Sequence, residues 1–177
     1  MTVALSWIVL SIMGAVPFVI SRSIPNPVDA LFETVSGFTT TGASILSDVE
    51  ALPHCVLMWR SFTHWIGGMG VLVFILSLLP LTGGYHMNLM KAESPGTSIS
   101  KLAPKVQSTA KILYTIYFVM PVAQMILLLL GGMPLFDTIC TAFGTAGTGG
   151  FGIKSDSMAG YSTYLQVVIT IFMILFG

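Results

Sequence analysis

Two short segments rich in threonine and glycine offer the most specific chemistry in this chain. They are TTTGA at residues 39–43 and AGTGG at residues 146–150. Neither contains an ionisable side chain, so the groups that they can supply are backbone carbonyl oxygens, which replace the hydration shell of a dehydrated cation. Glycine also permits backbone dihedrals and a close approach that other residues forbid. The segments therefore predict coordination of a cation by the backbone.

Each of these segments ends a longer stretch that occurs twice, at residues 27–43 and 134–150. At one constant interval the matched residues are Pro27 with Pro134, Thr34 with Thr141, Gly37 with Gly144, Thr41 with Thr148 and Gly42 with Gly149. Carbonyls can ring an ion only where several such loops converge, so repetition is what a narrow pore requires. The duplication favours a pore over the alternative, a re-entrant turn that binds no ion.

Other chemistries have weaker support. The string GTGGFG at residues 147–152 has the spacing of a dinucleotide-binding loop, but no strand precedes it and no helix opens on it. Cys55 and Cys140 form an isolated pair, for which two free thiols are favoured, and the three histidines have no metal-ligand spacing. His64 lies in an apolar segment, where a neutral, hydrogen-bonded histidine is the favoured interpretation. It has no carboxylate partner at helical spacing, so we predict no enzyme and no covalently bound cofactor.

A short helix is expected before each loop. Asn26 can cap a helix that opens at Pro27 and runs to about residue 36, where Gly37 stops it. The segment from Pro134 to residue 143, followed by Gly144, repeats this pattern. Neither helix can span a bilayer. A half-helix that enters from the outer side aims the partial negative charge of its carboxyl end toward the membrane centre, where it stabilises a cation, and the loop beyond it then runs extended with its carbonyls inward.

The composition predicts an all-α membrane protein. The chain is 54% hydrophobic and only 8% charged, with a mean hydropathy of +0.89. Residues 3–20, 61–85, 112–136 and 157–177 contain no Asp, Glu, Lys or Arg over about the 20 residues that a bilayer demands. Any one of them could be a buried core helix, but the chain has too little polar sequence to cover four. In the second, Gly67, Gly68 and Gly70 favour close helix packing over a hinge.

The distribution of lysines predicts the orientation. Lys91, Lys101, Lys105 and Lys111 lie between the second and third spans, accompanied only by Glu93. The positive-inside rule places residues 86–111 in the cytoplasm and both Thr/Gly loops outside. The sequence thus divides into a first helix–pore loop–helix repeat at 1–85, a cytoplasmic linker at 86–111 and a second repeat at 112–177, which stops within its last helix.

Six acidic residues lie near the two outer loops: Asp29, Glu33, Asp48, Glu50, Asp137 and Asp156. They could raise the local concentration of cations at a pore mouth. Alternatively they are simply solvated, and Asp29 and Asp137 complement the dipoles of the two short helices. Both interpretations stay open, since one residue can do both.

The residues also resemble a known family. FETVSGFTTTGAS at 32–44, WRSFTHWIGGMG at 59–70 and AESPG at 92–96 are similar to the first pore repeat of the TrkH/KtrB superfamily (Trk/Ktr/HKT) of potassium uptake proteins. STAK at 108–111, TAGTGGFG at 145–152 and DSM at 156–158 are similar to its second repeat. The resemblance covers nearly the whole chain.

The resemblance implies a function and a set of partners. Thr40, Thr41 and Gly42 would be selectivity-filter residues of the first repeat, and Gly147, Thr148 and Gly149 those of the second, with potassium bound mainly by their carbonyls. Members of this family carry four such repeats around one pathway, so this chain is expected to be a piece holding two. A homodimer in the bacterial inner (cytoplasmic) membrane, a cytosolic nucleotide-binding regulatory subunit of the TrkA/KtrA kind and no nucleic-acid partner are implied as well. The alternative is a two-repeat cation channel that forms its pore as a homodimer.

Overall fold

The computed structural model describes residues 2–70 and 103–177, which form six helices and no strand. The helices are α1 (Thr2–Ile20), α2 (Pro27–Phe38), α3 (His54–Gly68), α6 (Ala103–Leu130), α7 (Leu135–Ala146) and α8 (Thr163–Phe176). The all-α fold predicted from the composition is confirmed.

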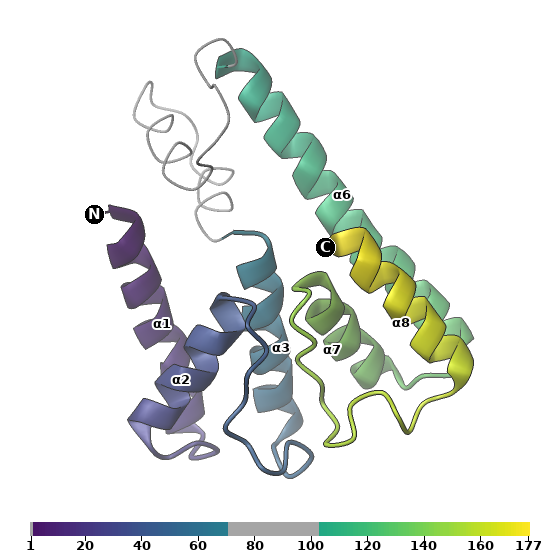
Figure 1. The fold of residues 1–177 in the computed structure, drawn as a ribbon. Coiled ribbons are helices and arrows are strands. Elements are labelled where there is room, and N and C mark those ends of the chain that lie inside the picture. Colours follow the sequence, from purple (N-terminus) through teal and green to yellow (C-terminus); the bar gives the residue numbers. More distant parts are fainter. Residues whose placement is uncertain (1, 71–102) are drawn as a thin grey trace.

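The helices form two similar units (Figure 1). In the first, α1 runs toward the lower edge of the molecule in this view, α2 climbs part of the way back, and a loop returns to the edge before α3 climbs again. In the second, α6, α7 and α8 follow the same course. Each short helix therefore ends in the interior of the molecule. Contacts between α3 and α7 join the two units.

The first short helix begins as its sequence predicts and ends later. Asn26 caps it, because its Oδ1 accepts a hydrogen bond from the Val28 backbone N–H at 3.0 Å, and Pro27 occupies the first turn. The helix continues past Gly37 to Phe38, so the prediction that Gly37 stops it is wrong. A Cβ at Gly37 would collide with the Thr63 side chain. This glycine therefore permits the close packing of α2 on α3.

The second short helix differs from its prediction in the same way. It runs from Leu135 to Ala146, with Pro134 in the cap position before it. Gly144 lies inside the helix, and a Cβ there would come within 2.7 Å of the Phe151 carbonyl oxygen. Gly144, which was expected to end the helix, instead makes room for the backbone of Phe151 in the loop that follows α7.

Three apolar clusters hold the units together. The first links α1, α2 and α3, and its buried members are Ala15, Phe18, Ile24, Ala30 and Val56. The second links α6 and α8, through Leu128, Met133, Leu165, Val168, Ile169 and Phe172. The third lies between the units and contains Val49, Leu57, Cys140 and Ile153. Val49 lies in the loop after α2 and Ile153 in the loop after α7, so buried apolar contacts hold both loops against α3 and α7.

The glycines near the end of α3 serve packing. A Cβ at Gly67 would collide with the Phe38 carbonyl oxygen, and one at Gly68 would lie 2.9 Å from the Gly147 Cα. Close packing at these two glycines, as predicted, is confirmed. Gly70 follows the helix with a φ of 65°. The second segment predicted to span, 61–85, continues beyond residue 70 and so lies partly outside the described residues.

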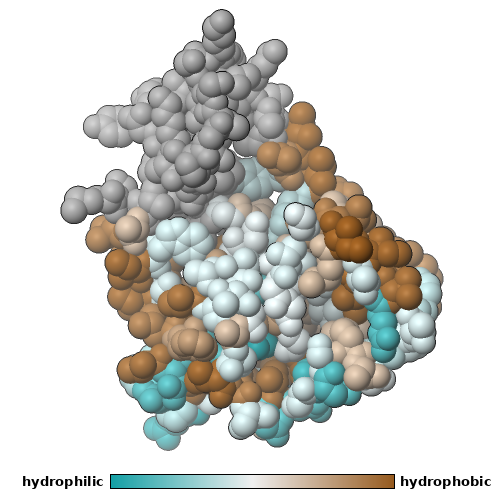
Figure 2. Space-filling view, in the orientation of Figure 1, coloured by the Kyte–Doolittle hydropathy of each residue, from teal (hydrophilic) through white to brown (hydrophobic). Residues whose placement is uncertain are grey.

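The outer faces of the long helices are apolar and exposed. Figure 2 shows brown surface on the two flanks of the molecule and hydrophilic surface along its lower edge. The exposed apolar side chains include Ile8, Ile12, Ile116, Ile126, Val167 and Ile174, from α1, α6 and α8. Among the described helices, Ile112–Leu130 of α6 is the one that is both long and apolar enough to cross a membrane, while Ala4–Ile20 and Thr163–Phe176 are apolar but shorter.

The predicted bounds change at three places. α6 begins at Ala103, so the last part of the segment 86–111 is helical, and the rest of that segment lies outside the described residues. The third predicted span ends at Leu130 rather than at residue 136, because a turn with Gly132 at a φ of 83° separates α6 from α7. The last span begins at Thr163 rather than at residue 157.

Candidate ion-coordinating site

The loop after α2 alternates in backbone handedness. Thr39 has a φ of −83°, Thr40 of 54° and Gly42 of 74°, while Thr41, between the last two, keeps a negative φ. The expectation that this loop runs extended is therefore wrong at Thr40 and Gly42.

The loop after α7 repeats this alternation. Gly147 has a φ of −77°, Thr148 of 57° and Gly150 of 72°, and Gly149 keeps a negative φ. A left-handed β-branched residue is an outlier that costs on the order of 1–3 kcal/mol, and such strain clusters at functional sites. Here it occurs in both loops, at Thr40 and at Thr148. The same unusual conformation therefore recurs at the same place in both loops.

The structural repeat is displaced by one residue from the sequence match. Leu135 lies 108 positions after Pro27, and the left-handed residues Thr148 and Gly150 lie 108 positions after Thr40 and Gly42. The sequence match had paired Gly42 with Gly149, at an interval of 107. Gly150 is thus the conformational counterpart of Gly42, and sequence matching missed it. Identical residues at the interval of 108, such as Asp29 with Asp137 and Thr40 with Thr148, were the available signal.

The two loops touch each other at their glycines. A Cβ on Gly42 would collide with the Gly149 carbonyl oxygen, and a Cβ on Gly149 would collide with the Thr40 carbonyl oxygen. The side chains of Thr41 and Thr148 are exposed next to this contact. The structure therefore brings together five of the six residues predicted as ligands. The sixth, Gly147, is buried, and a Cβ on it would collide with the His64 ring.

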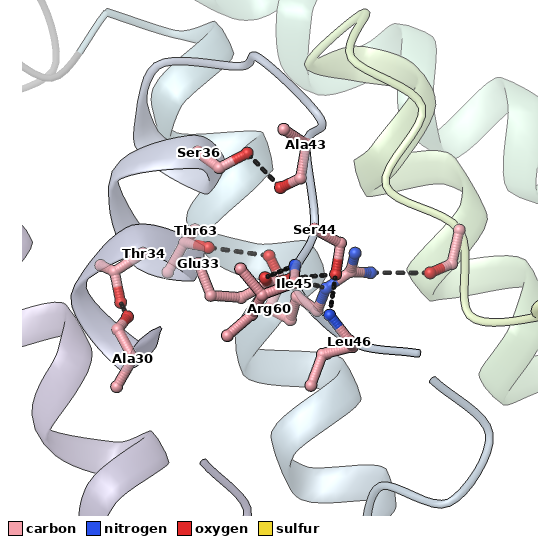
Figure 3. A network of polar contacts seen from close by, with 11 residues as sticks. Ala30, Glu33, Thr34, Ser36, Ala43, Ser44, Ile45, Leu46, Arg60 and Thr63 are labelled. Carbon is pink, nitrogen blue, oxygen red and sulfur yellow. Dashed lines mark hydrogen bonds and ion pairs between the residues drawn. The ribbon is translucent and has the colours of Figure 1, made fainter. Parts of the chain in front are cut away.

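A buried ion pair lies behind the first loop (Figure 3). Arg60 Nε donates to Glu33 Oε1 at 2.6 Å, and the two side chains are 3% and 0% exposed. Glu33 also accepts from Ser44 Oγ at 2.9 Å and from the Ile45 backbone N–H at 3.2 Å. Glu33 is therefore buried and not solvated, so that interpretation is wrong for this acid. Through Ser44 and Ile45, Glu33 binds the loop that follows α2. The positive charge of Arg60 compensates the negative charge of Glu33.

The same arginine reaches the second loop. Arg60 Nη1 donates to the Gly152 carbonyl oxygen at 2.7 Å, and its guanidinium carbon lies 3.7 Å from the centroid of the Phe151 ring. Figure 3 shows this bond leaving the network toward the neighbouring loop. Arg60 therefore links Glu33 of α2 to the segment that follows the second loop, a role that the sequence analysis did not predict.

His64 also contacts the second loop from α3. Its Nε2 accepts a hydrogen bond from the Gly149 backbone N–H at 3.0 Å, and its ring stacks on Phe151 with 4.8 Å between centroids. An accepting Nε2 carries no proton, so the imidazole is neutral with its proton on Nδ1. The prediction of a neutral, hydrogen-bonded histidine is confirmed.

The other five acidic residues near the two loops are partly or fully exposed. Asp48, Glu50 and Asp156 are exposed, and Asp137 accepts a hydrogen bond from Tyr161 Oη at 2.8 Å. Cys55 and Cys140 are free thiols. In the part of the chain that the structure describes, no three His, Cys, Asp or Glu side chains lie close enough to hold a metal ion. The chemistry of the site is therefore that of the backbone loops.

Comparison with known proteins identifies the family of this chain. A family model described as TrkH, a cation transport protein, matches residues 1–177. The chain belongs to the TrkH family. The Trk system potassium uptake proteins TrkH of Salmonella typhimurium and of Escherichia coli K12 are 42% and 41% identical to it over 180 residues. These alignments cover 99% of this chain and 37% of each relative.

The fold has a solved counterpart in the same family. The crystal structure of the potassium transporter TrkH from Vibrio parahaemolyticus matches with a TM-score of 0.75 and 33% sequence identity, over 97% of this chain and 34% of that one. The resemblance noted in the sequence is thereby confirmed, and a membrane location follows from the family. The chain spans a little over a third of the length of these TrkH relatives.

Proposed function

We propose that this chain forms part of a potassium uptake pathway through the bacterial cytoplasmic membrane. The observation that carries the proposal is the pair of matched loops, each with alternating backbone handedness, which meet at Gly42 and Gly149. The names of the relatives, which are potassium uptake proteins, support potassium as the ion. No enzymatic activity and no covalently bound cofactor belong to this proposal.

The ligands would be drawn from the backbone carbonyls of Thr40, Thr41, Gly42, Gly147, Thr148 and Gly149. A potassium ion is bound in such a filter by several carbonyls that replace its water. The carboxyl ends of α2 and α7 lie directly before these loops, so their partial negative charges act on the same place. Gly147 is the cap residue of α7 and is buried against His64.

The pathway would need further partners. Two loops surround an ion on about half of its circumference, so two more repeats of the same protein would complete the ring. The family resemblance adds a homodimer and a cytosolic nucleotide-binding regulatory subunit as proposals. The exposed apolar faces of α1, α6 and α8 would contact lipid.

The test of this function is potassium uptake by the full-length protein. Bacteria that lack their own potassium uptake systems should grow at low potassium when they express the protein and should accumulate rubidium as a tracer. Cells with the empty vector are the control. Failure of uptake by protein that is present in the membrane would contradict the proposal.

The 177-residue chain alone should not conduct selectively. With half of the ring absent, carbonyls of the Thr/Gly loops would face water or lipid, at a cost of several kcal/mol for each unsatisfied group in hydrocarbon. The measurement is potassium and sodium flux in liposomes that contain the purified chain. Selective potassium flux would favour the alternative, a two-repeat channel that forms its pore as a homodimer.

The orientation can be tested by labelling. In a full-length background with Cys55 and Cys140 replaced, a single cysteine at Ser47, which is exposed beyond the first loop, should react with a membrane-impermeant maleimide in intact cells. A cysteine at Ser98, which lies outside the described residues, should react only after permeabilisation. Labelling of both from the same side would contradict the proposed topology, in which the loops face outward and residues 86–111 the cytoplasm.

A further inference from the structure

The end of α2 is closed by two hydrogen bonds of its own backbone. Thr40 N–H donates to the Gly37 carbonyl at 3.1 Å and Thr41 N–H donates to the Ser36 carbonyl at 3.0 Å. Together with the left-handed Thr40, these bonds form a Schellman motif, in which the loop is tied to the last turn of its own helix.

The end of α7 keeps only one of these two bonds. Thr148 N–H donates to the Thr145 carbonyl at 2.9 Å, as in the inner bond of the motif. The next amide, that of Gly149, corresponds to that of Thr41, but it donates to His64 Nε2 at 3.0 Å instead of to its own helix. A side chain of the first unit thus takes the place of a backbone carbonyl of the second.

His64 is itself fixed in position. It is fully buried, and its ring stacks on Phe151, with the guanidinium of Arg60 also against that ring. Arg60 lies one helical turn before His64 on α3 and binds the Gly152 carbonyl at 2.7 Å. Packing therefore fixes the position of His64 Nε2, which accepts the hydrogen bond from the Gly149 amide.

We propose that His64 is a positioning residue of the ion pathway: its Nε2, by holding the Gly149 amide, sets where the second loop lies against Gly42 of the first. This inference rests on the proposed function. The Gly149 amide belongs to the same planar peptide unit as the Thr148 carbonyl, and the Gly149 carbonyl lies in the next unit, so both candidate ligands are attached to the group that His64 holds. A shift of this amide moves those carbonyls relative to the first loop, so His64 influences which ion fits without touching the ion.

The test uses two substitutions that differ in one property. In His64→Gln, the side-chain oxygen is separated from Cα by as many bonds as Nε2 is and can accept the same hydrogen bond. His64→Leu has no acceptor. In the full-length protein, we expect His64→Leu to lower the ratio of potassium to sodium uptake by about tenfold, about the effect of one hydrogen bond, and His64→Gln to stay within about threefold of the wild type.

A control on the same helix separates positioning from general stability. Trp59 Nε1 donates to the Gly14 carbonyl at 2.9 Å, which ties α3 to α1 and contacts neither loop. Trp59→Phe removes this bond and should leave the ion ratio unchanged, even if less protein accumulates. If His64→Leu does not accumulate, His64→Asn replaces it, because its oxygen is one bond too short to reach the amide.

The outcomes distinguish the two proposals. The inference is supported if the ratio of potassium to sodium uptake falls in His64→Leu or His64→Asn, which have no acceptor within reach of the Gly149 amide, and is retained in His64→Gln. An unchanged ratio in His64→Leu or His64→Asn, or an equal loss in His64→Gln, overturns it. If the wild-type protein takes up no potassium, the proposed function itself fails instead, and if Gly42→Ser and Gly149→Ser both leave the ratio unchanged, the candidate site fails.

Discussion

Replacing Gly42 or Gly149 with serine in the full-length protein is expected to remove most of its discrimination between potassium and sodium. Gly42 has a φ of 74°, where an L-residue costs about 1–2 kcal/mol, and a Cβ there would collide with the Gly149 carbonyl oxygen. Gly149→Ser would push against both the Thr40 carbonyl and His64. Because about 1.4 kcal/mol corresponds to tenfold, we expect the uptake ratio to fall by at least about tenfold in each variant.

Two other glycines provide matched controls for this result. Gly132, in the turn between α6 and α7, has a φ of 83°, and nothing lies within 4 Å of the place that a Cβ would occupy, so Gly132→Ser introduces backbone strain without a collision. Gly150 has a φ of 72° and the same open space, so Gly150→Ser introduces backbone strain in the second loop without the collision that Gly149→Ser causes. Gly132→Ser should lower stability but not selectivity. If both Gly42→Ser and Gly149→Ser keep the wild-type ratio, the candidate site is wrong.

Breaking the ion pair between Glu33 and Arg60 is expected to destabilise the protein strongly. Glu33→Gln leaves the Arg60 guanidinium buried without an opposite charge, for which the cost is about 3–5 kcal/mol, and it weakens the bonds to Ser44 and Ile45. We expect a lower midpoint of thermal unfolding in detergent, followed by tryptophan fluorescence, and reduced accumulation in the membrane.

The same chemical change at an exposed acid is the control. Glu50→Gln alters a side chain that lies at the surface and should change the free energy of unfolding by no more than about 0.5 kcal/mol. In the double variant Glu33→Leu with Arg60→Met, no buried charge is left unpaired, so its destabilisation should be smaller than the sum of the two single effects. Equal unfolding midpoints for Glu33→Gln and Glu50→Gln would show that the pair contributes nothing.

Local features could be predicted from the sequence because they depend on residues close together in the chain. The opening of α2 at Asn26 and Pro27 is an example, since a cap and a proline act within one turn. The apolar composition predicted the membrane, and the repeated threonines and glycines predicted two loops at Thr40 to Gly42 and at Gly147 to Gly149. The family followed from the same strings.

The ends of the short helices could not be predicted in the same way. Gly37 and Gly144 have the residue type that often ends helices, but both lie within their helices. Glycine is needed at these positions because the Thr63 side chain and the Phe151 backbone pack where a Cβ would be. The interval between the repeats was predicted as 107 residues, but the backbone conformation repeats after 108. Identity of side chains paired Gly42 with Gly149, whereas the backbone conformation pairs it with Gly150.

The sequence by itself determined the class of this protein: the half-helices, the Thr/Gly loops and the apolar spans are encoded by neighbouring residues and by composition. Only the tertiary structure decided how the loops are held. Glu33 and Arg60 are 27 positions apart and His64 and Gly149 are 85 apart, and nothing in local periodicity specifies which face of α3 meets which loop. That choice is made by the packing of α2 and α7 on either side of α3, where glycines allow the backbones to approach and a buried charge must find its partner.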